Sequence, residues 1–332
     1  MYSDEDLDAA VNAKVLSQDS VQHFREFIAK QRNGSLNDEE HFRLISGFND
    51  VFVAIAAMLF MASISWLGTK VAPFIGALGL LFSAWFLAET FVRKRHLAFP
   101  AIVLLISFIG SVFWLSISLL RYLMTDPSML LIASIITFFA SYLHWRRFQV
   151  PITVATAVAF VLAAIISFMT EEKALIRFIM PMFFVAGLSC FAYAMWWDSQ
   201  DRHRQTRKSD VAFWLHLLAA PLIVHPIFTS IGIFDTNSNL LQISLVLLLY
   251  ASLAIVSLIV DRRALMLSAL FYALYALTHM LKTYGSLDQG FALAGLMIGG
   301  ALLILSVFWH STRALLIRHL PIAYQHKLPT VQ

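Results

Sequence analysis

Residues 213–228 read FWLHLLAAPLIVHPIF, a run with two histidines and two prolines but no Asp, Glu, Lys or Arg. Apolar neighbours extend the run to residues 211–234. An α-helix needs roughly 20 apolar residues to cross a hydrocarbon core about 30 Å thick. The stretch therefore predicts a transmembrane helix that carries polar and helix-breaking residues inside it.

The composition of the whole chain agrees with this prediction. Hydrophobic residues make up 59% and charged residues 13%, and the mean hydropathy is +0.74, whereas about 25% of the residues of a soluble domain are charged. A single cysteine, Cys190, excludes a disulfide framework and a thiolate metal cluster. The sequence contains no HExxH, no Walker loop and no GxSxG with a partner set, so we predict no catalytic residues, metal or cofactor.

Reading the chain for runs of this kind gives ten spans, and hence an all-α bundle over residues 51–311, a soluble helical segment over 1–50 and a tail over 312–332. The predicted spans are 51–69, 71–91, 98–120, 127–145, 150–169, 175–197, 211–234, 240–260, 264–281 and 291–311.

Positive charges predict the orientation of these spans. Ten spans place both termini on one side, and 19 of the 24 Lys and Arg fall on that side. Because Lys and Arg collect in cytoplasmic loops, both termini are predicted to be cytoplasmic in a bacterial inner membrane. The isoelectric point near 9.2 reflects these loops beside the lipid bilayer and does not indicate a nucleic-acid partner.

Residues 1–50 differ from the rest, with ten Asp and Glu against five Lys and Arg. They predict short acidic helices, one capped by Ser17 or Asp19 and another beginning at Asp38. Because 50 residues form only a small core, we expect these helices to dock on each other, on loops or on a cytoplasmic protein partner. His41 beside two glutamates fits a solvated helix start better than a metal site.

The candidate site is in the seventh span, at His216, Pro221, His225 and Pro226. Proline in a membrane helix is tolerated where neighbouring helices, water or a ligand satisfy the freed carbonyl. The two histidines are nine residues apart, so they face opposite ways unless the prolines break the helix. A broken helix would expose a substrate-binding or gating site around His225. The alternative is a kinked structural helix whose histidines bond to neighbouring helices.

Other polar or small residues in the spans receive simpler interpretations. Glu89 and Arg93 have the spacing of a helical ion pair. Gly295 and Gly299 have the spacing of a helix-packing motif, either within the bundle or in a dimer.

A minority alternative is a membrane haem protein, since the histidines of the spans share depths in two pairs. The pairs would be His144 with His216 and His225 with His279.

Three segments resemble a known family. They are DEEHFRLISGFNDVFVAIA (38–56), DRRALMLSALFYALYAL (261–277) and GALLILSVFWHSTRALLIRHLP (300–321). Together they are similar to a family of polytopic proteobacterial inner-membrane proteins with a short helical cytoplasmic N-terminus and no assigned reaction. The resemblance implies location and topology only.

Two functions follow from these observations. The first is a secondary transporter of a small molecule or lipid, with the seventh span as the binding or gating helix. The second is a non-catalytic scaffold, assembly factor or signalling partner that acts through the acidic residues 1–50. The small number of polar residues in the spans favours the scaffold, and the two prolines favour the transporter.

Overall fold

The computed structural model describes residues 48–123, 128–201, 206–232, 240–283 and 289–319, together with residues 7, 11, 13, 15–24, 321 and 328. The chain divides into two units, Met1–His41 with Gln332 and Phe42–Val331. In the first unit residues 18–24 are helical, and the Ser17 hydroxyl accepts a bond from the Ser20 amide at 3.1 Å, as the predicted cap would. The helix predicted from Asp38 lies outside the described residues.

The second unit is all-α, and its described residues include ten helices that are long and apolar enough to cross a membrane, which confirms the predicted fold class. The elements are α3 (Phe48–Val71), α4 (Pro73–Ala88), the π-helix η1 (Glu89–Lys94), α5 (Ala98–Leu123), α6 (Ser128–Phe148), α7 (Ile152–Glu171), the 3-10 helix η2 (Lys173–Phe178), α8 (Ile179–Ser199), α9 (Arg207–Ser230), α10 (Leu240–Val260), α11 (Ala264–Thr283), α12 (Gly290–Val307) and α13 (Trp309–Arg318). The spans agree with the predicted ones to within a few residues at most ends. The chain is therefore an integral multi-span membrane protein.

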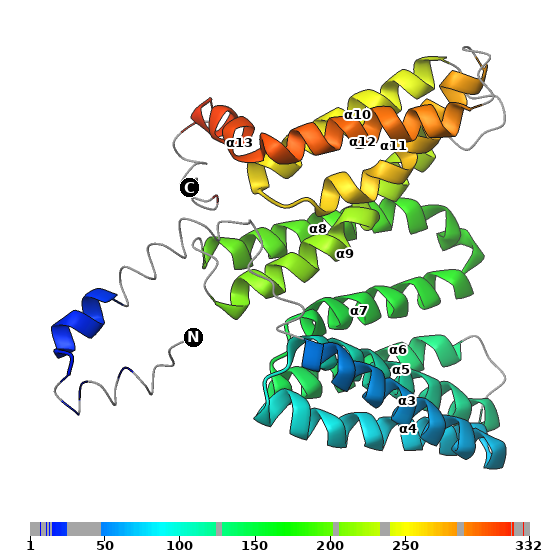
Figure 1. Ribbon diagram of the computed structural model, residues 1–332. Helices are drawn as coiled ribbons and strands as arrows, with labels where there is room; N and C mark the ends of the chain where they lie inside the picture. Colours follow the sequence, from blue (N-terminus) through cyan, green and yellow to red (C-terminus); the bar gives the residue numbers. More distant parts are fainter. Residues whose placement is uncertain are drawn as a thin grey trace. The chain divides into compact units, whose positions relative to one another are not determined.

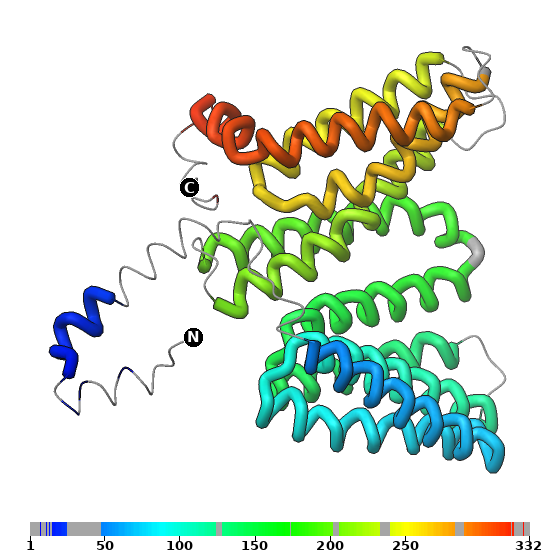
Figure 2. The backbone as a smooth tube through the Cα atoms, in the orientation of Figure 1, coloured from blue at the N-terminus to red at the C-terminus, as the bar shows by residue number. Residues whose placement is uncertain are grey.

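Helices that follow one another in the sequence mostly lie side by side, as the colours of Figure 2 show. Helices α3, α4, α5 and α6 form one group, and α7 packs on α6. Helices α8 and α9 form the most extensive pair, and α10, α11 and α12 lie beyond them in Figure 1. Helix α9 contacts α7, α8 and α11. It therefore lies between the group of α3 to α7 and the group of α10 to α12.

Helix α9 is also the most buried of the ten spans. Gly187 of α8 explains its close approach, because a Cβ atom there would lie 2.9 Å from the Ile223 backbone nitrogen. Three residues further along α8, the Cys190 thiol donates to the Leu215 carbonyl at 3.4 Å. The segment of α9 around the two prolines therefore contacts α8 through its backbone.

A break in this helix was one of two alternatives, and the structure does not have it. Helix α9 is continuous from Arg207 to Ser230, with Pro221 and Pro226 inside it. Each proline removes only one backbone hydrogen bond, and in a membrane helix neighbouring helices hold the remaining turns in place. The packing of α9 against α7, α8 and α11 supplies such neighbours.

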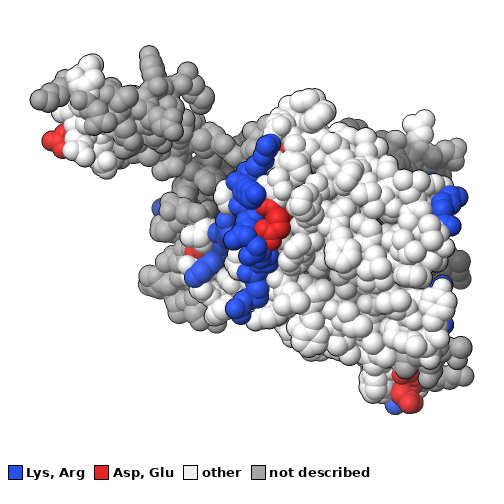
Figure 3. Space-filling model, turned by 90° about the horizontal axis from the view of Figure 1, so that it is seen from below, with Lys and Arg blue, Asp and Glu red and all other residues white. Residues whose placement is uncertain are grey.

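One end of the bundle carries most of the described Lys and Arg side chains, and we call it the basic end. Its described basic residues are Arg93, Lys94, Arg95, Arg146, Arg147, Arg207, Lys208, Arg262, Arg263, Arg313 and Arg318. At the opposite end the described basic side chains are Lys70, Arg121, Arg177 and Lys282. Figure 3 shows such a band of Lys and Arg along one edge of a broad face with few charges.

Three tight turns at the basic end contain a non-glycine residue with positive φ. These are His96 (54°), Gln149 (56°) and Asp261 (58°). The left-handed conformation ends a helix abruptly and costs a non-glycine residue roughly 1 kcal/mol or more. It lets consecutive spans reverse direction within a few residues.

The last span ends earlier than predicted. Helix α12 stops at Val307, and Phe308 (φ −97°, ψ 16°) separates it from α13. Helix α13 buries Trp309, Arg313 and Ile317 and contacts α10 and α12. The predicted boundary between bundle and tail at residues 311 and 312 falls inside this docked helix, because hydropathy alone does not reveal that Trp309 turns inward.

Candidate functional site

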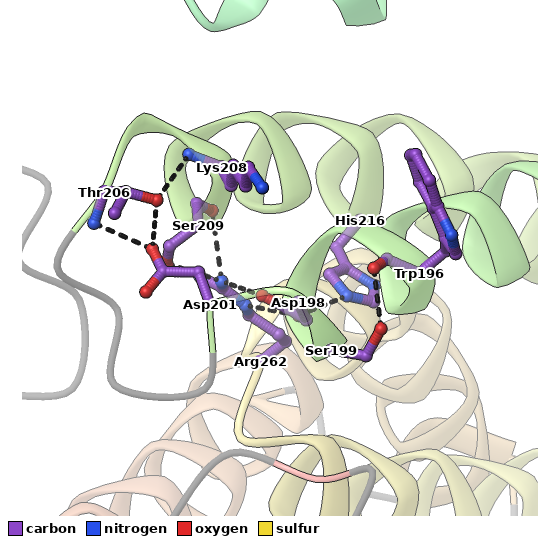
Figure 4. A network of polar contacts seen from close by, with 9 residues as sticks. All are labelled: Trp196, Asp198, Ser199, Asp201, Thr206, Lys208, Ser209, His216 and Arg262. Atoms are coloured by element: carbon purple, nitrogen blue, oxygen red, sulfur yellow. Dashed lines mark hydrogen bonds and ion pairs between the residues drawn. The ribbon is translucent and has the colours of Figure 1, made fainter.

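The described part of the basic end holds a group of buried polar side chains, which we call the polar cluster: Asp198, Ser209, His216 and Arg262 (Figure 4). Asp198 is the penultimate residue of α8, Ser209 and His216 belong to the first half of α9, and Arg262 lies in the turn between α10 and α11. Asp198 and His216 are each 1% exposed and Arg262 is 2% exposed. Three separate elements therefore meet at charged groups that water does not reach.

Asp198 is the centre of the polar cluster. Its Oδ1 accepts a bond from Arg262 Nη2 at 2.6 Å, and its Oδ2 accepts from His216 Nε2 at 3.0 Å and from Arg262 Nε at 3.3 Å. Arg262 Nη2 also donates to the carbonyl and hydroxyl oxygens of Ser209, each at 3.2 Å. The buried carboxylate is neutralised by a guanidinium in a two-point contact, the strongest geometry for such a pair.

The turn that carries Arg262 connects the polar cluster to α13. Asp261 accepts a bond from Trp309 Nε1 at 2.8 Å and lies 3.7 Å from Arg313 Nε. The Arg263 guanidinium lies 4.7 Å from the Trp309 ring centroid. Consecutive residues of one turn therefore bind α13 on one side and the α8–α9 pair on the other.

The start of α9 is fixed by a second carboxylate. Asp201 accepts bonds from the Thr206 amide and hydroxyl, both at 2.7 Å. The Thr206 hydroxyl oxygen in turn accepts from the Lys208 amide at 3.3 Å and caps the helix. The first turn of α9 is thereby aligned so that Ser209 and His216 face α8 and the Arg262 turn.

A groove of about 580 Å³ lies between α9 and α11, and we call it the α9–α11 groove. Its described lining is Leu217, Pro221, Ala264, Leu267, Ser268, Phe271, Tyr272 and Tyr275. None of these side chains is charged, and three are aromatic. The volume lies within the range of small-molecule sites, about 300–1,000 Å³.

The histidine of the predicted site lies beside this groove. His225 Nδ1 and the Tyr272 hydroxyl are joined by a hydrogen bond of 2.6 Å. The Tyr272 ring stacks on Phe228, with centroids 4.6 Å apart. Leu217, Pro221 and His225 are spaced at i, i+4 and i+8 and so follow one face of α9 toward α11.

The structure thus separates the residues that the sequence grouped. His216 belongs to the polar cluster, whereas Pro221 lines the α9–α11 groove and His225 bonds to its wall. Pro226 is buried in the bundle. The two histidines contact different elements, as their spacing on an unbroken helix requires.

Asp198 and Arg262 were missed as site residues. Asp198 falls one residue beyond the predicted sixth span, and Arg262 was interpreted as a loop charge. The sequence does contain a signal for them. An acidic and a basic residue that lie at span ends, on the same side of the membrane as a histidine within a span, are at the right depth to contact that histidine. Depth alone does not show which helices are neighbours.

The four histidines of the haem alternative have different described neighbours. His144 contacts Phe108 and Phe148, with ring centroids 5.4 Å and 4.6 Å apart, whereas His216 bonds to Asp198. His279 stacks on Tyr275, at 6.4 Å. Among the described residues, no three His, Cys, Asp or Glu side chains are grouped so that they could hold a metal ion.

Glu89 lies near Arg93, with 3.2 Å between Oε2 and Nη1, and also near Arg147 of α6, with 2.6 Å between Oε1 and Nε. It sits in the π-helical turn η1 and is partly exposed. Gly295 and Gly299 do not pack against a helix within the described bundle, because a Cβ atom at either position would meet nothing within 4 Å. Helix α12 is also among the least buried spans, and a packing role for that spacing stays a prediction.

Comparisons of the chain with protein-family models, with curated proteins and with solved structures find no match. The resemblance to the proteobacterial family stays a prediction.

Proposed function

We propose that this chain is a secondary transporter for an uncharged amphiphilic small molecule or lipid. The α9–α11 groove would be the substrate site, and the polar cluster would be the gate that closes the basic end. The proposal includes the predicted setting, a bacterial inner membrane with both termini cytoplasmic, which the bias of Lys and Arg toward the basic end supports.

One helix, α9, joins the polar cluster to the groove. His216 of α9 bonds to Asp198 in the polar cluster, and Pro221 of the same helix lines the groove five residues further on. A proline interior to a helix removes a backbone bond and makes bending easier there. Separation of the polar cluster would therefore be transmitted to the groove through α9.

The lining of the groove decides the substrate class. With no charged side chain among its described residues, the groove offers nothing to neutralise an ionic ligand, and burying an unpaired charge is costly. Aromatic rings and leucines suit an apolar body, while the hydroxyls of Ser268, Tyr272 and Tyr275 suit one or two polar groups. An uncharged amphiphile has both features.

The polar cluster suits a gate because it is strong when closed and separable. The pair of Asp198 and Arg262 joins α8 to the α10–α11 turn, two elements far apart in the sequence. Each partner also has a second contact on α9, with His216 or Ser209. Opening would exchange these bonds for water at the basic end, so the ions are not left without partners.

Thiol labelling tests the proposal without knowledge of the substrate. Ser268→Cys, in a Cys190→Ser background, places a thiol in the groove, and a membrane-impermeant maleimide is added to vesicles of either orientation. Ile255→Cys is the matched control, because Ile255 is 46% exposed on α10 and is nearly as far from the basic end of its helix as Ser268. We expect labelling of Ser268→Cys and none of Ile255→Cys. Equal protection of both would mean a groove filled by lipid, and would end the transporter proposal.

A second candidate function, the scaffold, is favoured by the separation of Met1–His41 as a unit of its own. Deletion of residues 1–46 tests it. Loss of a cross-linked protein partner, with unchanged labelling at Ser268→Cys, would assign the N-terminal unit to partner binding.

A further inference from the structure

A second groove lies in the other group of helices, between α3, α4 and α5, and we call it the α3–α5 groove. Its volume is about 760 Å³. Helix α3 supplies most of the described lining, from Met58 to Lys70, and Ser107 and Trp114 of α5 form the facing wall. This groove shares no lining residue with the α9–α11 groove.

Tight packing of α3 on α4 explains where this groove is. A Cβ atom at Gly68 would lie 2.9 Å from the Gly76 Cα, so the two backbones touch at the end where α3 stops. Helix α3 packs less extensively on α5 than on α4. The space left between α3 and α5 is the groove.

The length of the groove matches one leaflet of a bilayer. Met58 and Lys70 are twelve residues apart on one helix, which corresponds to about 18 Å. A hydrocarbon core of about 30 Å gives each leaflet roughly half that thickness. One acyl chain therefore fits along the groove, from the end of α3 toward the bilayer centre.

The two ends of the groove differ in chemistry as the two ends of a lipid do. Met58 and Met61 make the deep end apolar, whereas Thr69 and Lys70 lie at the shallow end. The ammonium of Lys70 lies 4.8 Å from the centroid of the Trp66 ring. Trp and Lys at the end of a span are typical of the headgroup level.

The charge of Lys70 selects the headgroup. Among the described side chains Lys70 has no acidic partner, and it is the single charged residue of the groove lining. A lysine near the membrane surface attracts an anionic lipid by roughly fivefold in affinity. The lysine would raise the affinity for a zwitterionic headgroup less, because that headgroup has no net negative charge.

We infer that the α3–α5 groove binds one anionic phospholipid, with an acyl chain along α3 and the phosphate at Lys70. The lipid comes from the leaflet at the end opposite the basic end, which is the outer leaflet if both termini are cytoplasmic. This inference does not depend on the proposed transport function.

Native mass spectrometry of the purified protein in detergent, with added phosphatidylglycerol or phosphatidylethanolamine, tests it. We expect one phosphatidylglycerol to be retained in preference to phosphatidylethanolamine, and Lys70→Gln to weaken its binding about fivefold. Lys282→Gln is the matched control, since Lys282 is an exposed lysine at the same end of the bundle outside the groove. Equal retention of both lipids by the wild-type protein and by Lys70→Gln would overturn the charge argument.

A pair of bulky substitutions on α5 tests the position of the acyl chain. Ser107→Phe fills the groove, whereas Gly110→Phe adds the same ring where a Cβ atom meets nothing within 4 Å. We expect Ser107→Phe to remove the bound lipid and Gly110→Phe to keep it. Retention of the lipid by both variants, or retention of a fatty acid in its place by the wild-type protein, would contradict the proposed occupant.

Discussion

Two tyrosines of neighbouring helices, Tyr272 and Tyr250, differ in what their hydroxyls contact. Tyr272 is bonded to His225 at 2.6 Å, whereas the buried hydroxyl of Tyr250 has no hydrogen-bond partner among the described residues. A hydrogen bond contributes about 1 kcal/mol net, while a buried group without a partner contributes nothing or is unfavourable. The pair therefore separates the effect of the hydrogen bond from that of the hydroxyl itself.

We predict that Tyr272→Phe lowers the free energy of unfolding by about 1 kcal/mol, and that Tyr250→Phe leaves it unchanged or raises it slightly. Equilibrium unfolding in mixed micelles measures both values. If the two variants lost the same stability, the bond between His225 and Tyr272 would have no part in holding α9 on α11.

His144 poses a different question, because it is 1% exposed and neither ring nitrogen has a partner among the described residues. It is surrounded by aromatic rings, among them Phe108 and Phe148. Burial of a polar group without a hydrogen bond is unfavourable by roughly 1–3 kcal/mol. We therefore predict that His144→Phe is neutral or stabilising by up to about 2 kcal/mol, as measured by thermal unfolding.

A matched variant shows whether this result is specific. His216→Phe would leave Asp198 without one of its donors and should destabilise the protein where His144→Phe does not. A large loss of stability in His144→Phe would contradict this prediction, and would mean that the imidazole makes a favourable contact that a phenyl ring cannot replace.

At the scale of elements, α9 is a continuous helix that contains two points of weakness. Pro221 has no N–H to donate to the Leu217 carbonyl four residues earlier. Replacing Pro221 by alanine restores this bond and stiffens the helix. Pro73 offers a control, because it begins α4, where a proline removes no helical bond.

We predict that Pro221→Ala raises the midpoint of thermal unfolding and slows hydrogen exchange in α9, while Pro73→Ala does neither. In the Ser268→Cys background, the same substitution should slow maleimide labelling of the groove several-fold, because bending of α9 is what would admit water. If the helix were stiffened and the rate of labelling did not change, bending of α9 would have no part in gating.

The elements were largely predictable from the sequence, but their partners were not. Whether a segment spans the membrane depends mainly on its own roughly 20 residues. The span around residues 213–228 and the nine other spans could therefore be predicted from the sequence alone. Whether Pro221 breaks its helix depends on α8 and α11, which no local pattern reveals. Likewise α12 ends at Val307, and Trp309 turns inward to bond to Asp261 of a distant turn, which hydropathy does not reveal.

The candidate site shows the same division. His216 and His225 were identified because a polar residue in an apolar run is visible in the sequence. Asp198 and Arg262 were not identified, since a charged residue at the end of a span is common. Their importance follows only from the fold, which places the two side chains 2.6 Å apart although they are separated by 64 residues in the sequence. The groove beside Pro221 could not be predicted, because it is formed by the packing of α9 on α11.

At the scale of the whole molecule, the asymmetry of charge predicts which end faces the cytoplasm. Gln200 lies at the basic end and Lys282 at the opposite end, and both are exposed. In intact cells, an impermeant thiol reagent should label Lys282→Cys and leave Gln200→Cys unlabelled until the membrane is permeabilised. The reverse pattern would invert the topology and place the gate on the outer side.

In the proposed transporter, the polar cluster controls access to the α9–α11 groove. Removing one ion alone would leave the other buried without its partner, so the informative variant is Asp198→Asn with Arg262→Gln. The matched control is Glu89→Gln with Arg147→Gln, which removes a pair that is partly exposed at the same end.

The most direct measurement is the rate of maleimide labelling at Ser268→Cys from the basic side, in the Cys190→Ser background, with each double substitution. We predict a rate at least about tenfold higher when Asp198 and Arg262 are neutralised, and an unchanged rate in the control. Equal rates in the two double variants would contradict it, and would identify the polar cluster as a structural tie between α8, α9 and the α10–α11 turn.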